Sequence, residues 1–304
     1  MVLGCSIVAS VILLASILAA GSGGDWSTAI LIEVDQSGNG DYRKIQDAID
    51  SVPSNNSDHI FILVKPGVYE EKIVVPADKP FITLSGTKAT ETTGVTVERF
   101  LSLLHFQFWL LISWPVISQF WILSHQDTLL DDRGRHYYSN CYVEGDTDFI
   151  FGNGASIFQK CHLHSVAGGM GAITAQRRQR AEEETGFTFV KCKITGVKSA
   201  VLGRPWGKYS RVVFALSYMS NVVLPQGWDD WGDSSKQRSA YYGEYKCYGA
   251  GARTSKRVKW SHRLSGQEAA PYLRGDMMGG SSWIRSAPSH FRRISAAISP
   301  QPNS

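Results

Sequence analysis

Three segments of the chain repeat one pattern: residues 138–145 read YSNCYVEG, residues 158–165 read FQKCHLHS and residues 189–196 read FVKCKITG. Each begins with an aromatic residue, has Cys three positions later and ends in Gly or Ser. Apolar and polar residues alternate in between, as in a strand with one buried face. The cysteines lie 20 and 31 residues apart. This recurrence predicts the stacked coils of a solenoid, and the longer interval accommodates a charged, solvent-facing loop at residues 176–185.

The repeated cysteines have a simple explanation within such a solenoid. Cys141, Cys161 and Cys192 would stack as small apolar side chains inside a parallel β-helix. His162 and His164 lie on one face of a strand and are an alternative metal pair, but the sequence offers no third ligand at a recognisable spacing. We therefore expect a structural role for the cysteines.

The segments on either side of the repeats extend this plan. Apolar residues at Ile45, Ala48 and Ile49 predict a short amphipathic helix over residues 41–52, with Asp41 as its N-cap, which would cover the open end of the solenoid. Short strands are predicted at residues 60–64, 73–75 and 81–84. Residues 286–304 are expected to form a loose tail.

Composition and charge exclude several classes of protein. The chain has 304 residues, 43% of them hydrophobic and 19% charged, which excludes wholesale disorder. The formal net charge of +4 is too small to indicate a nucleic-acid-binding protein, but it suits a protein that acts on an anionic polymer. Five Cys in this length exclude a disulfide-dense small scaffold.

The amino-terminal segment has the features of a targeting sequence. Residues 2–20 are uncharged and almost wholly apolar, and small residues follow. We predict a signal peptide at residues 1–21 and a secreted protein, with a retained anchor helix as the alternative because the segment has no Lys or Arg at its start. Asn55 begins a glycosylation sequon, which is consistent with secretion.

One stretch interrupts the plan. Residues 100–123 contain no Asp, Glu, Lys or Arg and hold three Trp and four Phe. Their length alone allows a transmembrane helix. Pro115 and several polar residues argue against that interpretation, so we expect no stable membrane insertion.

Two carboxylates and an amide are the most distinctive chemical group in the sequence. Asp127 and Asp148 lie 21 residues apart, about one turn of the expected solenoid, so neighbouring coils would place them side by side. Adjacent carboxylates titrate at different pH, which lets one act as a nucleophile while the other holds a proton. Gln126 would supply an amide N–H to an oxyanion. The alternative is structural, with Asp127 capping a turn and Asp148 paired with an Arg.

Further strings in the chain resemble the plant pectinesterase (pectin methylesterase) family. In family order over roughly residues 31–285 they are GVYEE at 67–71, QDTL at 126–129, DFIFGN at 148–153, ITAQ at 173–176, LGRPW at 202–206, GW at 227–228, YYGEY at 241–245 and RVKW at 257–260. The DFIFG and LGRPW strings are highly specific together. The resemblance implies an all-β fold, a right-handed parallel β-helix domain over residues 26–285, of the short type without an N-terminal inhibitor-like pro-region.

The same resemblance implies catalytic roles. Asp148 would attack the methyl-ester carbonyl of a galacturonate unit. Asp127 would protonate the departing methanol and then act as base for the hydrolytic water. Gln126 would help to hold the oxyanion.

The resemblance also implies how substrate is held. Arg204 would keep Asp148 ionised and oriented, and Trp206 and Trp228 would form a surface for sugar rings. No metal or organic cofactor is implied. The expected substrate is methyl-esterified pectin (homogalacturonan), with a proteinaceous pectinesterase inhibitor as a candidate partner, and the expected protein is a monomer secreted to the plant cell wall.

The chain departs from the family pattern over residues 95–121. In the family, a QAVAL strand about 22 residues before the QDTL string supplies a second oxyanion donor, and that position holds Leu104 here. The repeat also predicts a Cys 20 residues before Cys141, where the chain has Trp121, so Cys141 would lack its disulfide partner. A retained intron would explain a replaced coil of this kind, and we expect low esterase activity from the chain as written.

Two alternative functions follow from these features. A β-helix with an incomplete oxyanion site would bind cell-wall polysaccharide without catalysis. A glycosidase on the same fold would also use paired carboxylates. The motif strings favour an ester substrate over a glycosidic bond.

Overall fold

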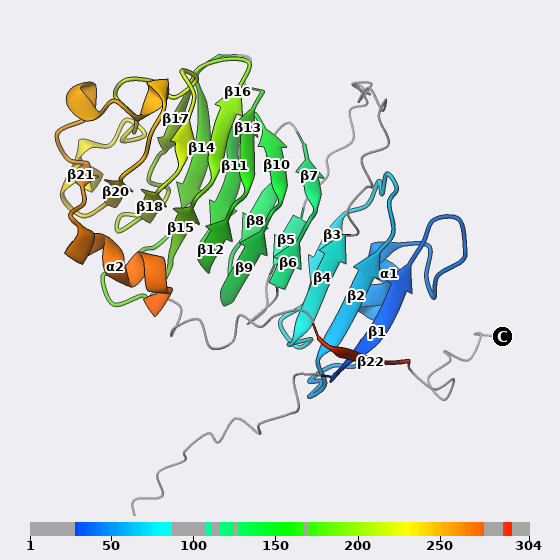
Figure 1. The fold of residues 1–304 in the computed structure, drawn as a ribbon. Coiled ribbons are helices and arrows are strands. Elements are labelled where there is room, and N and C mark those ends of the chain that lie inside the picture. The colour runs from blue at the N-terminus through cyan, green and yellow to red at the C-terminus, as the bar shows by residue number, and fades with distance from the viewer. Residues whose placement is uncertain are drawn as a thin grey trace, which may run out of the picture.

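The computed structural model describes residues 28–86, 108–110, 116–124, 127–166, 169–276 and 288–293. Within these residues the strands form three parallel sheets that run side by side along one elongated stack (Figure 1). We call them the eleven-stranded, six-stranded and five-stranded sheets. The predicted signal peptide at residues 1–21 lies outside the described residues.

The strand bounds follow the spatial order of each sheet. The eleven-stranded sheet contains β21 (His262–Arg263), β20 (Tyr241–Tyr245), β18 (Arg211–Ala215), β15 (Gly186–Val190), β12 (Ala155–Gln159), β9 (Arg135–Ser139), β6 (Val116–Ser118), β4 (Ile82–Gly86), β2 (Ile60–Val64), β1 (Thr28–Val34) and β22 (His290–Arg293). The six-stranded sheet contains β17 (Ala200–Gly203), β14 (Gly171–Gln176), β11 (Thr147–Gly152), β8 (Leu129–Asp131), β5 (Phe108–Leu110) and β3 (Ile73–Val75). The five-stranded sheet contains β19 (Tyr218–Met219), β16 (Lys193–Gly196), β13 (His162–Ser165), β10 (Tyr142–Gly145) and β7 (Trp121–Leu123).

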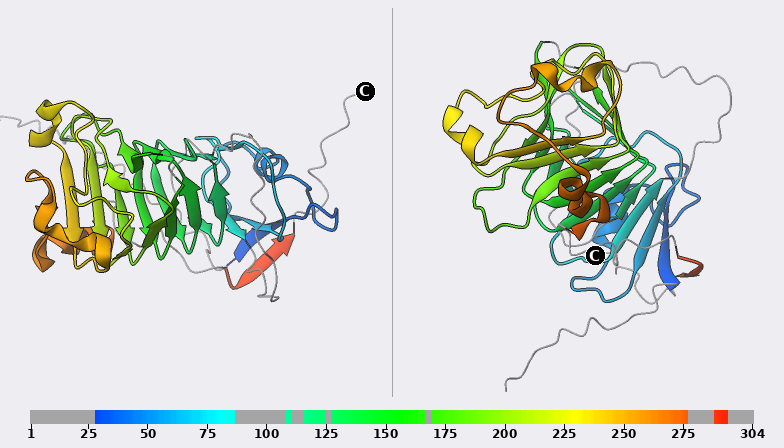
Figure 2. Two further views of the ribbon diagram at one scale, coloured as in Figure 1. Left: turned by 90° about the horizontal axis from the view of Figure 1, so that it is seen from above. Right: turned by 60° about the vertical axis from the view of Figure 1, so that its left-hand side comes forward.

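Successive coils of the stack contribute one strand to each sheet in turn. One coil consists of β9, β10 and β11, and the next consists of β12, β13 and β14. Tyr142 pairs with His162, 20 residues later, which is the spacing that the sequence repeat predicted. Figure 2 shows the coils following one another along the long axis. The chain is therefore a parallel β-helix, as expected.

A ladder of aromatic rings fills the interior. Tyr138, Phe158, Phe189 and Phe214 come from four successive coils, and each is fully buried. Their ring centroids lie 4.3, 4.6 and 4.4 Å apart in nearly parallel stacks. Such stacking adds to the hydrophobic contribution of each ring. The aromatic residue that opens each sequence repeat is thus a core residue.

The cysteines form a second ladder beside the rings. Each thiol lies near the carbonyl two residues earlier and a carbonyl of the preceding coil; the Cys161 sulfur, for example, is 3.5 Å from the Gln159 oxygen and 3.6 Å from the Tyr138 oxygen. Cys141, Cys161 and Cys192 are buried free thiols, which confirms their predicted structural role. Ser217 takes the same position in the coil between Cys192 and Cys247, where its hydroxyl donates to the Ala215 carbonyl.

The amino-terminal end is covered by a helix, as predicted, but its cap differs. Helix α1 (Ile45–Asp50) buries the three expected apolar side chains. Asp41 is not the N-cap: its carboxylate accepts a hydrogen bond from the Glu33 amide instead. The Glu71 carboxylate accepts from the Ile45 and Gln46 amides at 2.8 and 2.9 Å and so satisfies the helix start from another coil.

Part of the predicted loose tail is ordered. Residues of β22 pair in parallel with β1, with Thr28 opposite His290. The Arg293 guanidinium contacts the carboxylates of Glu33 and Asp41, and these contacts explain why this part of the tail is fixed. No local sequence pattern indicated this pairing, because its partner lies at the other end of the chain.

The described part of the atypical apolar stretch belongs to a coil of the stack. Its described residues form β5, β6 and β7, which pair with β8, β9 and β10 of the next coil. Tyr142 lies opposite Trp121, so Phe120, and not Trp121 as predicted, falls opposite Cys141. Among the described residues, no helix has the length and apolar character needed to span a bilayer.

The carboxyl-terminal end is closed by short helices and a buried ion pair. Helix α2 (Gly266–Arg274) starts with a capping box between Ser265 and Glu268, and three 3₁₀ turns precede it: η1 (Ser234–Arg238), η2 (Ala250–Ala252) and η3 (Thr254–Lys256). Arg257 donates to both carboxylate oxygens of Glu244 at 2.7 and 3.0 Å, and both side chains are 5% exposed. Glu244 of β20 pairs with Phe214 of β18, so this ion pair lies where the next ring of the aromatic ladder would be.

Candidate active site

Asp127 and Asp148 lie on neighbouring coils. In the six-stranded sheet, Ile150 of β11 pairs with Leu129 of β8, an offset of 21 residues that also relates Asp148 to Asp127. Both aspartates are partly buried and have positive φ angles, 53° and 51°. This conformation is uncommon for residues other than Gly, and Asp is among those that adopt it most readily. The predicted juxtaposition of the two carboxylates is therefore present in the fold.

Asp148 is held by a guanidinium from a coil further along the stack. The Arg204 Nε donates to Oδ1 at 2.8 Å and its Nη2 donates to Oδ2 at 2.6 Å. Arg204 follows β17, and its backbone amide donates to the Thr174 carbonyl of β14. The two parallel bonds fix the plane of the carboxylate, which is what a positioned nucleophile requires.

Opposing effects act on the titration of Asp148. Burial raises the pKa of this carboxyl group above its ordinary value, because desolvation disfavours the charged form. The hydrogen bonds and charge of Arg204 lower the pKa, while the negative charges of Asp127 and Asp229 raise it. The net direction is upward. The pKa of Arg204 is raised in turn, chiefly by its hydrogen bonds to Asp148.

Exposed aromatic rings lie next to this pair. Trp206 is 39% exposed, and its ring centroid lies 6.3 Å from that of Phe151. The Arg177 guanidinium lies 4.9 Å from the Trp206 ring and forms an ion pair with Asp132. Trp206 thus lies at the surface, as its predicted role in sugar binding requires.

The expectation for Trp228 is wrong. Its side chain is 1% exposed, stacks on Tyr242 at 4.4 Å and points its indole N–H toward Glu244. Trp231 is the exposed ring instead, at 38%, and the Arg204 guanidinium lies 4.0 Å from its centroid. Local sequence does not distinguish these rings, because both lie within four residues of Gly227 and only tertiary packing decides which one is buried.

Gln126 lies outside the described residues. Sequence reasoning also missed Asp229, whose charge acts on both Asp148 and Arg204. Its amide donates to the Gly203 carbonyl, so it sits beside the start of the Arg204 segment. Its position directly after the GW string was the available signal. Among the described residues, no group of three or more His, Cys, Asp or Glu side chains is arranged to hold a metal ion.

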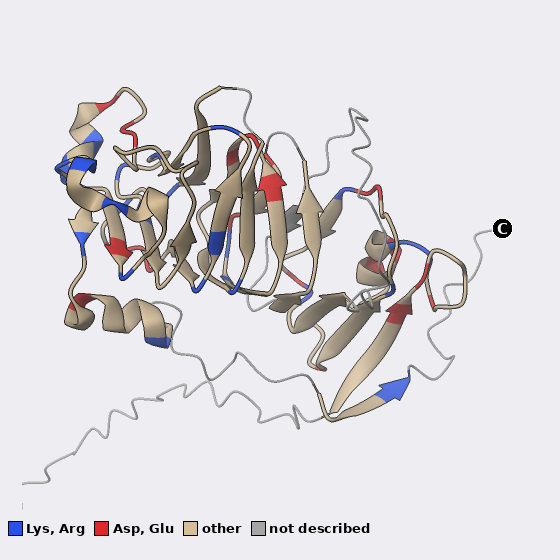
Figure 3. Cartoon of the chain, turned by 45° about the horizontal axis from the view of Figure 1, so that its top comes forward, with Lys and Arg blue, Asp and Glu red and all other residues tan. Residues whose placement is uncertain are grey.

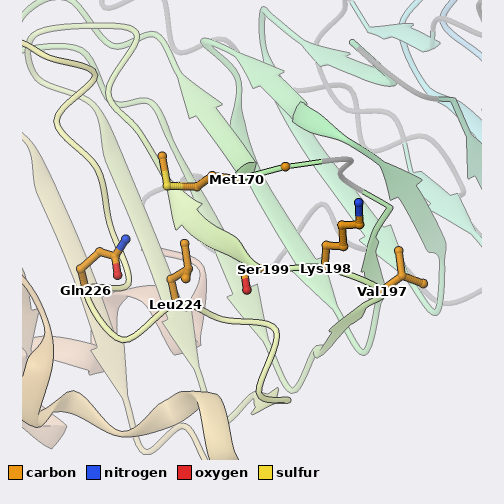
Figure 4. Close-up of a pocket in the computed structure, with 7 residues that line it drawn as sticks. Met170, Val197, Lys198, Ser199, Leu224 and Gln226 are labelled. Carbon is orange, nitrogen blue, oxygen red and sulfur yellow. The ribbon is translucent and has the colours of Figure 1, made fainter.

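A shallow open pocket lies at the amino ends of β14 and β17, the same end of the six-stranded sheet at which Asp148 enters β11. Figure 4 shows the side chains that line it: Met170, Val197, Lys198, Ser199, Leu224 and Gln226. Gly171 pairs with Ala200 here, and Ala172 pairs with Thr147 next to Asp148. The pocket thus lies at the end of the six-stranded sheet where β11 begins, and its lining comes from the coils that follow Asp148.

The site can carry out nucleophilic chemistry with a second carboxylate at hand. Asp148 is oriented by two hydrogen bonds, and Asp127, just before the neighbouring strand β8, is a group able to give or take a proton. Trp206 and Trp231 provide flat apolar surface on which sugar rings would stack. This combination suits attack on an electrophilic carbon of a carbohydrate ligand.

Comparisons with known proteins show which family and which fold the chain resembles. The family model described as Pectinesterase matches residues 31–103 and 113–281, so its match is interrupted inside the stretch that departs from the expected pattern. Putative pectinesterase 11 of Arabidopsis thaliana is 51% identical over 297 residues, covering 88% of this chain and 84% of that protein. Pectinesterase QRT1 of Arabidopsis thaliana is 36% identical, covering 84% and 79%. The solved structure of pectin methylesterase from carrot has a TM-score of 0.70 and 28% identity, covering 83% of this chain and 94% of that one.

Proposed function

This chain belongs to the pectinesterase family, and we propose that it hydrolyses the methyl esters of pectin through direct attack of Asp148 on the ester carbonyl. The observation that carries the proposal is the paired hydrogen bonding of Arg204 to Asp148 beside Asp127. A carboxylate held in this way needs no reorientation before attack. The substrate is homogalacturonan, and the products are methanol and a free galacturonate carboxylate.

In the first half of the reaction, an Asp148 oxygen forms a bond to the ester carbon. The carbonyl oxygen takes up the negative charge, and Gln126 is proposed to donate a hydrogen bond to it. Protonated Asp127 gives its proton to the methoxy oxygen as the carbon–oxygen bond breaks. Methanol leaves, and the galacturonyl group remains on Asp148 as a mixed anhydride.

In the second half, ionised Asp127 removes a proton from water. The hydroxide oxygen bonds to the same carbon, the bond to Asp148 breaks and the product departs as galacturonic acid, which loses its proton to the solvent. Both aspartates thereby return to their starting protonation states. Arg204 acts in both halves of the reaction, because it stabilises the Asp148 carboxylate whenever that group is ionised.

Substrate binding is assigned to the exposed rings beside the aspartates. Trp206 is proposed to stack on a sugar ring, with Arg177 behind it to fix the indole plane. Trp231 would take the role first expected of Trp228, since it is exposed and lies against Arg204. We place the enzyme outside the cell, in the plant cell wall, where its polymeric substrate occurs.

The experiment that tests this proposal measures methanol release from highly methylated homogalacturonan, together with new reducing ends. An esterase yields methanol alone, whereas a glycosidase yields reducing ends. A second candidate function, polysaccharide binding without catalysis, is favoured by one observation: the family match is interrupted at residues 104–112. Retention on immobilised pectin with no methanol release would select that function.

A further inference from the structure

A row of surface residues repeats at one corner of the stack, away from the six-stranded sheet that carries the aspartates. The turn from the eleven-stranded to the five-stranded sheet is made by a residue with positive φ; along successive coils these are Gln119, Asn140, Lys160, Lys191, Leu216 and Lys246. The residue two positions after each positive-φ residue points outward. Along the same coils these outward residues are Trp121, Tyr142, His162, Lys193, Tyr218 and Tyr248. Equivalent residues of neighbouring parallel strands lie about 4.8 Å apart.

The first rings of this row form a continuous aromatic surface. Trp121 is 62% exposed, and its centroid lies 5.0 Å from that of Tyr142. The Tyr142 and His162 rings form a T-shaped pair with centroids 4.9 Å apart. Hydrogen bonds hold these side chains in place: Tyr142 donates to Glu144 at 2.6 Å, and His162 bonds to the Thr195 hydroxyl at 2.7 Å. Tyr142 and His162 are therefore fixed in advance of any ligand.

Basic side chains run alongside the rings. Lys160, Lys191 and Lys193 are exposed, and none has an ion-pair partner among the described residues. Figure 3 shows basic positions at successive turns along one side of the stack. His162 adds no charge near neutral pH, because burial and the positive charge of Lys193 lower its pKa to about 4. Glu144 is the acidic group on these strands, and its carboxylate is engaged by Tyr142.

We propose that this basic aromatic strip, formed by Trp121, Tyr142, His162, Lys160, Lys191 and Lys193, binds a second segment of de-esterified homogalacturonan. The choice of polymer rests on the proposed function. Ring faces suit the apolar faces of sugar rings, and a line of ammonium groups matches the carboxylates that ester hydrolysis creates. Because the row follows the long axis of the stack, it fits an extended chain rather than a single sugar.

The strip and the catalytic site lie on different sheets. Asp148 belongs to the six-stranded sheet, Asp127 lies just before its strand β8 and Arg204 directly follows its strand β17. The strip lies on the five-stranded sheet and its corner. A polymer held on the strip therefore leaves the catalytic surface open. Product binding of this kind would retain the enzyme on regions of pectin that it has already demethylated.

The test compares two triple variants that remove equal charge. The strip variant is Lys160→Asn, Lys191→Asn and Lys193→Gln. Asn140 has the same positive φ at the equivalent turn of an earlier coil, so we expect the two Asn substitutions to preserve folding. The control variant is Lys44→Gln, Lys256→Gln and Lys259→Gln, at exposed positions elsewhere. Binding of unesterified polygalacturonate is measured by titration at several salt concentrations, and methanol release is measured on a short methylated oligogalacturonide.

For the strip variant we expect the polygalacturonate dissociation constant to rise about tenfold, the size expected from three exposed ion pairs, with a shallower salt dependence. Methanol release from the short oligomer stays at the wild-type rate. Trp121→Ala weakens polygalacturonate binding in the same direction. Unchanged binding in the strip variant, an equal loss in the control variant, or equal retention on an uncharged β-glucan would overturn the proposal. A chain that binds polygalacturonate at the strip but releases no methanol would overturn the proposed function alone.

Discussion

Arg204 donates two hydrogen bonds to the two carboxylate oxygens of Asp148, although the two residues lie 56 positions apart in the sequence. The contact spans the coils between β11 and β17, so it exists only when the stack is assembled. Catalytic geometry is therefore coupled to folding of this part of the β-helix.

Asp148→Asn should abolish methanol release while leaving pectin binding in place. The amide has nearly the same shape as the carboxylate, but it is not a competent nucleophile toward an ester. Methanol is measured by end-point assay, and binding is measured by retention on immobilised pectin. Near-normal turnover by the substituted protein would exclude Asp148 as the nucleophile.

Arg204→Gln should shift the acidic limb of the pH–activity profile to higher pH. Burial raises the pKa of Asp148, and Arg204 opposes that effect, so loss of the guanidinium raises the pKa further. The nucleophile is active only when ionised, and activity is thus lost at a higher pH as the solution is acidified. The profile of kcat/KM against pH gives the measurement.

Arg177→Gln is the matched control for that shift. Its guanidinium contacts Trp206 and Asp132 but makes no hydrogen bond to Asp148. We expect KM to rise with no displacement of the acidic limb. An identical displacement in both variants would mean that general surface charge, and not the Arg204 contact, sets the titration of Asp148.

Trp206 and Trp228 should respond in opposite ways to truncation. Trp228→Ala removes a buried ring stacked on Tyr242 and should lower the free energy of unfolding by about 3–5 kcal/mol. Trp206→Ala should cost far less stability and raise KM, because its ring is partly exposed at the site. Denaturant unfolding and steady-state kinetics distinguish the two. Comparable stability losses would contradict the assignment of Trp206 to the substrate surface.

Replacement of residues 95–121 by a family-like coil, with the missing Gln and Cys, should increase both soluble yield and activity. One absent oxyanion donor costs about 10²–10³ in rate, and exposed aromatic side chains promote aggregation. Trp121 is one such side chain among the described residues, at 62% exposure. Yield is measured by soluble expression and activity by methanol release. Full activity and solubility of the unmodified chain would show that Gln126 or another donor is sufficient.

The internal repeat of the sequence predicts which residues of neighbouring coils lie side by side. The 20-residue spacing of Tyr142 and His162 and the 21-residue spacing of Asp127 and Asp148 follow directly from the period of one coil. Burial of Cys161 follows from the same period, because a residue at the same point of each coil meets the same surroundings. The fold and the central pair of aspartates were therefore accessible without coordinates.

Other features depend on contacts that no local pattern encodes. Trp228 and Trp231 follow one turn, and only the packing against Tyr242 decides which ring enters the core. Asp41 has the residue type of an N-cap, but the helix start is satisfied by Glu71 from another coil. Phe120 faces Cys141 because the coil that contains it is one residue longer than the repeat suggested.

The pairing of β22 with β1 has a consequence for association between molecules. Without β22, the eleven-stranded sheet would end on the seven-residue, largely apolar β1, whose unpaired backbone groups could template the strand of another chain. With β22 in place, the outermost strand is four residues long, fully exposed and carries Arg292 and Arg293. Short, charged edge strands of this kind disfavour pairing with another chain. The carboxyl-terminal segment thus protects the solenoid from end-to-end association through its sheet edge.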